Sequence, residues 1–118
     1  MSSLASQIQE GYPAPILPGR IQPDEDMEKT FRLLADKWRE ETAYFSLALK
    51  KAVHPAYQRI IGMGPNAIPL ILRELEQRPG HWFWALNAIA GEDPARPDDN
   101  FDQAVEAWLR WGRTKGYL

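Results

Sequence analysis

The chain of 118 residues contains no cysteine, which excludes disulfide bonds, thiol catalysis and zinc held by sulfur ligands. It also has almost no excess of charge, and its formal net charge of -2 gives no general attraction to nucleic acid or to anionic membranes. Long apolar runs are missing too, since none approaches the roughly 20 residues that a membrane helix needs. The first residues lack a basic segment followed by an apolar core, so we expect no signal peptide and a cytoplasmic location.

Signatures of catalysis are equally scarce. The patterns GxxxxGKS/T, GxGxxG, HExxH and GxSxG do not occur, so the usual phosphate-binding, zinc-protease and serine-hydrolase sites have no counterpart here. The two histidines, His54 and His81, show no metal-ligand spacing, and each stands at or just before an expected helix start. Neighbouring acids such as Glu74 and Glu76 are expected on solvated faces. We therefore predict no catalytic residue, no cofactor and no metal site.

Proline is concentrated at the N-terminus. Residues 1–23 contain Pro13, Pro15, Pro18 and Pro23, which oppose both helix and central strand, so this segment is expected to form an extended arm. Its apolar side chains either lie along a groove of the domain or belong to a loose leader: Tyr12, Ile16, Leu17 and Ile21. Residues 24–118 are expected to form a single all-helical domain.

A long helical pattern opens at Asp24, directly after Pro23, with acidic residues that suit the positive end of a helix dipole. Apolar residues then recur at spacings of three and four, which predicts one buried face: Met27, Phe31, Leu34, Trp38, Thr42, Phe45 and Leu49. The pattern indicates one helix, or two helices with a bend near residues 42–46. Packing on the rest of the chain is the expected role of this face, and a coiled-coil seam for a partner is the alternative.

Glycine and proline divide the next stretch into short helices. Pro55 suits a first helical turn, and Gly62 and Gly64 end that helix. The following helix begins near Pro65, and Pro69 predicts an irregular first turn or a kink.

Three consecutive aromatics, residues 82–84, belong to a third short helix that ends at Gly91. Because successive helical positions point about 100° apart, at least one of these aromatics must leave the main core face. The last helix begins at Asn100, where Gln103 completes a capping-box pattern. Its buried side is expected to comprise Val105, Trp108, Leu109 and Gly112. No segment alternates with a period of two for long enough to predict a strand.

Two parts of this region echo each other. One set of three residues recurs later in the chain at a constant offset: Ile60, Gly62 and Pro65 correspond to Ile89, Gly91 and Pro94. A second set of four residues recurs at a larger offset: Ala67, Ile68, Ile71 and Leu72 correspond to Ala104, Val105, Trp108 and Leu109. Each unit reads helix, Gly/Pro turn, helix, and neither could bury its apolar face alone. We predict two copies of one helix pair, stacked side by side.

The run IGMGPNAIPLILRELE resembles the turn and second helix of HEAT-type repeats. The ending, from NAIAGEDP to the tryptophan-rich last helix, is similar to the closing unit of bacterial HEAT-like proteins, with Ala90 where threonine is usual. The blocks HPAYQRIIGMGP and PGHWFWALNAIAGEDP also resemble a group of short bacterial proteins of unassigned activity. The resemblance covers residues 54–117. It implies an all-α fold, a short HEAT-like α-solenoid of two helix pairs in residues 54–118 capped by the long N-terminal helix, and no catalytic residues.

Aromatic residues are in excess, with five tryptophans. They either fill the core or form an exposed patch that binds a partner protein, since aromatic and arginine residues are enriched at binding hot spots. The residues predicted to bind the partner are Trp84, Trp111, Phe83 and Tyr57, with Arg73 and Arg110 at the rim. We expect a non-catalytic protein–protein interaction module, and self-association into a homodimer stays open.

Two alternative functions remain at this point. One is a small enzyme or ligand-binding protein with a pocket around His81 and nearby acids. The other is an antitoxin or immunity-type neutralising protein, which is a special form of partner binding. A cleft that holds His81 and two carboxylates with shifted pKa values would favour the enzyme.

Overall fold

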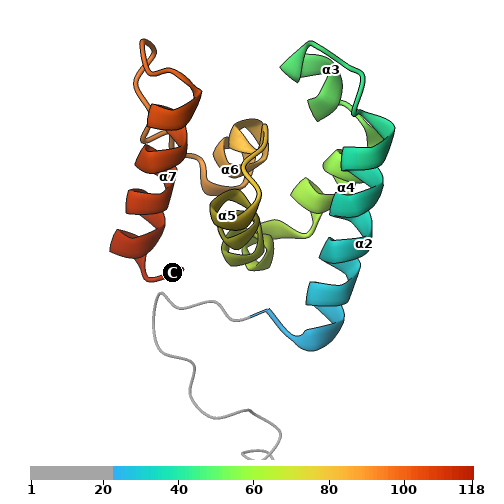
Figure 1. Cartoon of the computed structure of the whole chain (residues 1–118). Coiled ribbons are helices and arrows are strands. Elements are labelled where there is room, and N and C mark those ends of the chain that lie inside the picture. The colour runs from blue at the N-terminus through green and yellow to red at the C-terminus, as the bar shows by residue number, and fades with distance from the viewer. Residues whose placement is uncertain (1–22) are drawn as a thin grey trace, which may run out of the picture.

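The computed structural model describes residues 23–118, and all regular structure in that range is helical, as predicted (Figure 1). The arm predicted for the N-terminus lies almost entirely in residues 1–22, outside the described residues. The α-helices are α2 (Glu25–Glu41), α3 (Ala48–Ala52), α4 (Pro55–Gly62), α5 (Ala67–Gln77), α6 (Phe83–Ala90) and α7 (Phe101–Lys115).

The first helical pattern forms two helices, which confirms the second of the two alternatives. Asp24 caps α2, where its carboxylate accepts a hydrogen bond of 2.8 Å from the backbone N–H of Met27. The helix ends at Thr42, whose hydroxyl donates to the carbonyl oxygen of Trp38 at 2.6 Å. The chain then turns before α3, and the indole N–H of Trp38 ties the two helices together by donating to the carbonyl of Lys51 at 2.8 Å.

The predicted buried face was wrong beyond Thr42. Phe31, Leu34 and Trp38 are buried, but Phe45 and Leu49 expose 41% and 55% of their surface. The bend at Thr42 resets the helical phase, so the spacing of three and four no longer keeps later residues on the buried side.

The later helices begin and end where glycine, proline and capping residues predicted. His54 caps α4, where its Nδ1 atom accepts from the N–H of Ala56 at 3.0 Å. A 3₁₀ turn at Gly64–Asn66 precedes α5, and Pro69 lies in the first turn of that α-helix. Gly91 ends α6 with a positive φ of 72°, a conformation that costs glycine little.

The start of α7 confirms the predicted capping box. The side chain of Asn100 accepts from the backbone N–H of Gln103 at 2.8 Å, and the side chain of Gln103 accepts from the backbone N–H of Asn100 at 2.9 Å. These reciprocal bonds satisfy two backbone donors that the helix itself leaves free.

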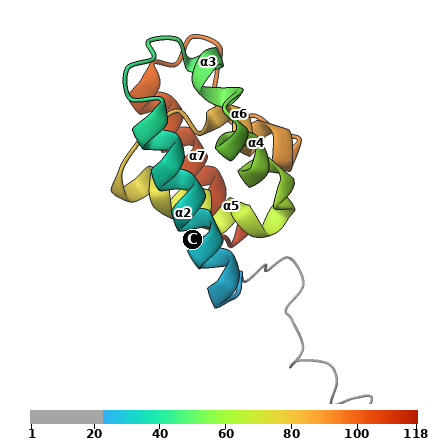
Figure 2. The ribbon, with the colours of Figure 1, turned by 90° about the vertical axis from the view of Figure 1, so that its right-hand side faces the viewer.

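The main helix contacts join α4 to α6 and α5 to α7, and α2 contacts both α4 and α5. Trp82 lies at the centre of the core, with ring centroids 4.4 Å from Trp38, 5.5 Å from Tyr57 and 5.8 Å from Phe31. In both views α3 and the start of α7 lie at the end of the molecule away from the C-terminus (Figure 1, Figure 2). Within residues 23–118, no helix combines the length and apolar character needed to cross a membrane.

Candidate binding surface

The six predicted partner-binding residues do not form one patch. Tyr57 is fully buried, so its assignment to an exposed patch was wrong. Its hydroxyl donates to the carbonyl of His81 at 3.1 Å and accepts from the N–H of Ala85 at 2.9 Å. Burial raises the pKa of Tyr57 far above its ordinary value. Tyr57 is therefore a core residue that joins α4 to the start of α6.

Trp111 lies at the C-terminal end of α7 and is half-buried. Its ring stacks on Tyr117 at 5.5 Å between centroids and meets Trp108 edge-on at 5.1 Å, while its N–H donates to the carboxylate of Glu92 at 3.2 Å. These contacts hold the end of the chain against α7. Trp111 is not among the residues that line the hollow beside Trp84.

The two arginines lie in separate places. Arg73 of α5 faces α2, where it pairs with Glu28 at 3.6 Å in a groove between the two helices. Arg110 lies on the exposed side of α7, beside the loop that precedes that helix. Neither is a rim charge of a patch around Trp84.

Trp84 is the predicted aromatic residue that is mostly exposed, with 57% of its area accessible. It lines a hollow together with Phe83, His81 and two alanines of α3, Ala48 and Ala52. The neighbouring segment 44–53 carries a concentration of exposed large apolar side chains, among which Tyr44 is 98% exposed. We call this region the α3–α6 surface, and its large apolar members are Tyr44, Phe45, Leu47, Leu49, Val53 and Trp84.

Two hollows meet at His81. The first, the Trp84 pocket, is the small one described above, with a volume of about 130 Å³. The second, the His81 pocket, has a volume of about 330 Å³ and is lined by Trp38, Arg39, Thr42, Ala43, Lys51, Pro79, Gly80, His81 and Phe101. Both hollows adjoin α3 and the segment that leads into α6, and the His81 pocket also reaches the end of α2 and the start of α7.

The His81 pocket differs from the acid–base site considered as an alternative. None of the described residues that line it is a carboxylate, so His81 meets no acidic partner there. Burial lowers the pKa of His81 below its ordinary value, and the nearby charge of Lys51 lowers it further. His54 is engaged elsewhere, since its Nδ1 atom accepts at the helix start and its Nε2 atom contacts Glu41 at 2.8 Å. Within residues 23–118, no three histidines and acids gather in a way that could hold a metal ion.

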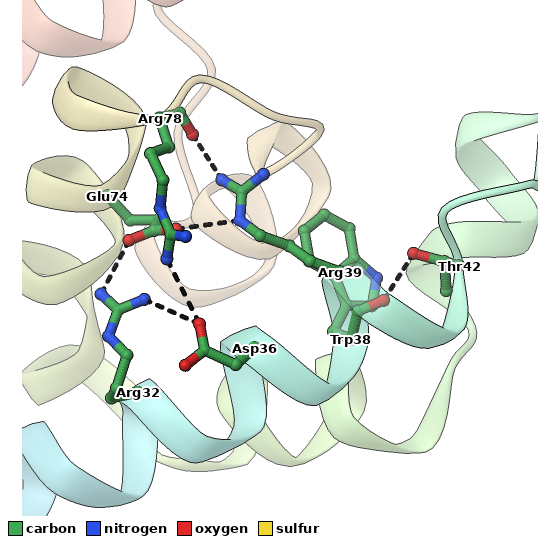
Figure 3. Close-up of polar contacts among 7 residues, drawn as sticks. All are labelled: Arg32, Asp36, Trp38, Arg39, Thr42, Glu74 and Arg78. Carbon is green, nitrogen blue, oxygen red and sulfur yellow. Dashed lines mark hydrogen bonds and ion pairs between the residues drawn. The ribbon is translucent and has the colours of Figure 1, made fainter.

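Glu74 is the clearest departure from the predicted solvated faces. Its side chain is completely buried between α2 and α5. It accepts hydrogen bonds from Arg32 at 2.8 Å and from Arg39 at 2.9 Å, and Arg78 lies 3.0 Å away (Figure 3). Burial alone would raise the pKa of Glu74, but the two arginines of α2 outweigh it and hold that pKa below its usual range.

The same cluster extends to the surface and to the His81 pocket. Asp36 accepts from Arg32 at 3.1 Å and from Arg78 at 3.3 Å, and Arg39 also donates to the carbonyl oxygen of Arg78 (Figure 3). The guanidinium of Arg39 is therefore already committed, although it lines the pocket. The cluster clamps α2 onto α5 and positions one wall of the pocket.

The residues that the sequence did not indicate as part of a binding surface are those of segment 44–53, which include Lys51. One signal could have revealed them. Segment 44–53 holds five large apolar residues beside only two lysines and no acid, which is more apolar surface than one short helix can bury on one side.

Comparison with protein-family models, with curated proteins and with solved structures finds no match to this chain.

Proposed function

We propose that this chain is a non-catalytic protein-binding module and that the α3–α6 surface is where the partner protein binds. The observation that carries the proposal is the concentration of exposed apolar side chains around α3 and Trp84. Exposed apolar side chains concentrated in one region mark interaction sites in monomeric proteins, whereas single exposed apolar residues do not. The Trp84 side chain supplies the large, rigid type of anchor that dominates binding energy at such sites.

The scaffold that presents this surface is, in our proposal, a pair of HEAT-like repeats. Two observations support it. The first is that α4 contacts α6 and α5 contacts α7, which are the contacts that stacking of two such pairs requires. The second echo of the sequence is buried at every position: Ala67, Ile68, Ile71, Leu72, Ala104, Val105, Trp108 and Leu109.

One detail changes the alignment of the two proposed repeats. Gly91, which ends α6, has a positive φ, whereas Gly62 lies inside α4 and the positive φ of the first turn falls on Gly64. The turns correspond in conformation through Gly64 and Gly91. The sequence pattern pairs Gly62 with Gly91, whereas the structure pairs Gly64 with Gly91. The two alignments therefore differ by two residues.

The test is capture of a partner by the immobilised full chain from a lysate of the source organism. We expect Trp84→Ala to reduce capture at least about tenfold, as the loss of an anchor residue does. Because Trp84 is mostly exposed, the free energy of unfolding should change by less than about 0.5 kcal/mol.

Two control variants accompany Trp84→Ala. Leu33→Ala removes an apolar side chain that is 72% exposed but lies in the groove between α2 and α5, so it should leave capture and stability unchanged. Ile71→Ala should cost about 2–5 kcal/mol of stability, since Ile71 is fully buried. The proposal is refuted if Trp84→Ala captures the same proteins at the same yield as the unaltered chain.

A further inference from the structure

The Trp84 pocket has the size and character of a receptor for one apolar side chain. Its volume of about 130 Å³ is close to the roughly 150 Å³ of an apolar cavity that accepts benzene. Ala48 and Ala52 form one wall with their small side chains, and Phe83 and Trp84 form the other. An aromatic or branched aliphatic side chain could fill this space without displacing any residue that lines it.

The adjoining His81 pocket is cationic. Arg39 and Lys51 line it together with His81, and no described residue of its lining is acidic. The Arg39 charge is balanced by Glu74, but within the described residues Lys51 has no carboxylate within ion-pair distance. Lys51 nevertheless lies close enough to His81 to act on its charge. Among residues 23–118, the Lys51 cation in this pocket therefore has no ion-pair partner, and it lies beside the partly buried ring of His81.

The two pockets share His81, so a single ligand segment can occupy both. We propose, building on the proposed function, that the α3–α6 surface binds a peptide segment of the partner protein. This segment places an apolar side chain in the Trp84 pocket and an Asp or Glu carboxylate against Lys51 in the His81 pocket. Charge complementarity of this kind fixes the register of a bound segment and disfavours basic partners.

The positive charges of α3 argue against a second copy of this chain as the ligand of the α3–α6 surface. In a two-fold dimer the same surface meets itself, so Lys50 and Lys51 of one copy would lie near those of the other. Like charges across an interface are unfavourable, and segment 44–53 contains no acid that could relieve them.

The test begins with a displayed library of random linear peptides, selected on the immobilised full chain. We expect the selected peptides to carry a large apolar residue within a few positions of an Asp or Glu. One of them is then synthesised, and its dissociation constant is measured by calorimetry for the unaltered chain and for charge variants.

The charge variants form a matched pair on adjacent residues of α3. Lys51→Glu should weaken binding about tenfold or more, whereas Lys50→Glu, which lies outside both pockets, should weaken it much less. A peptide in which lysine replaces the acidic residue should bind Lys51→Glu better than it binds the unaltered chain. Melting temperatures of both variants check that the fold is intact.

Several results would overturn this inference. They are selected peptides without an acidic bias, equal effects of the two lysine variants, an absence of any selected peptide, and a dimer in light scattering that Trp84→Ala dissociates. If partner capture still depends on Trp84 while the lysine exchange has no effect, the proposed function stands and the peptide chemistry is wrong. If capture does not depend on Trp84 either, both are wrong.

Discussion

At the scale of single residues, the main feature is the buried carboxylate of Glu74, which the sequence alone does not distinguish from an exposed acid. Glu74 stands two positions from Glu76 on the same helix, yet Glu74 is buried and Glu76 is exposed. The difference arises from Arg32 and Arg39 of α2, which reach across to Glu74 (Figure 3). A buried carboxylate needs such partners, because an unpaired charge away from water is costly.

We expect Glu74→Gln to lower the free energy of unfolding by about 3 kcal/mol at neutral pH. This is the lower end of the cost of breaking a buried ion pair, since the arginines left behind remain partly exposed to water. Urea unfolding monitored by tryptophan fluorescence measures the change. The matched control is Glu76→Gln, for which we expect a change below about 0.5 kcal/mol. Equal effects of the two variants would show that the clamp does not stabilise the fold.

At the scale of helices, the contact of α5 with α7 depends on a residue without a side chain. A Cβ atom on Gly112 would lie 2.6 Å from a methyl group of Leu72 and 3.3 Å from one of Leu118. Leu72 is fully buried, so its side chain has little room to move away. Glycine inside a helix costs roughly 0.5–1 kcal/mol relative to alanine, and here the close packing of α7 on α5 offsets that cost.

We expect Gly112→Ala to destabilise the protein by about 1 kcal/mol, because overpacking outweighs the gain in helix propensity. Gly62→Ala is the control, since Gly62 is also helical and no heavy atom lies within 4 Å of the position its Cβ would take. This variant should stabilise the protein by about 0.5 kcal/mol. Chemical unfolding of both variants gives the comparison. Stabilisation by Gly112→Ala would mean that α7 does not pack on α5 as closely as the structure shows.

At the scale of the whole molecule, stability should depend on pH in a direction set by the shifted groups. The pKa of Glu74 is lowered by its arginines, that of Asp36 is lowered because Arg32 and Arg78 outweigh its burial, and that of Glu41 is lowered by His54 and Lys37. A carboxylate with a lowered pKa stabilises the folded state above its ordinary pKa and loses this contribution as the pH falls through the folded value.

His81 and Tyr57 act at higher pH. The lowered pKa of His81 means that the unfolded chain takes up a proton first, so stability declines as the pH drops through about 6.5. The raised pKa of Tyr57 means that the unfolded chain ionises first at alkaline pH, so stability declines as the pH rises above about 10.

We therefore expect a plateau of stability between about pH 7 and 9, a gentle decline below about pH 6.5 and a steeper one below about pH 4.5. Urea unfolding over a series of buffers measures this profile. In Glu74→Gln the acid limb should be shallower, because the main buried carboxylate is gone. An acid limb of unchanged slope in that variant would show that Glu74 does not titrate with a lowered pKa.

Much of the helical architecture could be predicted because its signals act over a few residues. Gly91 and the Asn100–Gln103 pair mark the boundaries of α6 and α7, since capping and positive φ depend only on neighbours within one turn. The buried sides of α5 and α7 follow from helical periodicity in the same way. The excess of aromatics over one helix face also predicted that an aromatic such as Trp84 would reach the surface.

The sequence alone thus determined where most helices begin and end and which of their faces turn inward, because these depend on local backbone chemistry and periodicity. Only the tertiary structure decided between core and surface for Tyr57, whose hydroxyl finds its partners at His81 and at Ala85 of α6. It also decided the burial of Glu74, through arginines of a distant helix, and the exposure of the large apolar side chains of segment 44–53. The burial of these side chains depends on which helices contact one another in the fold, and the spacing of residues along the sequence does not predict those contacts.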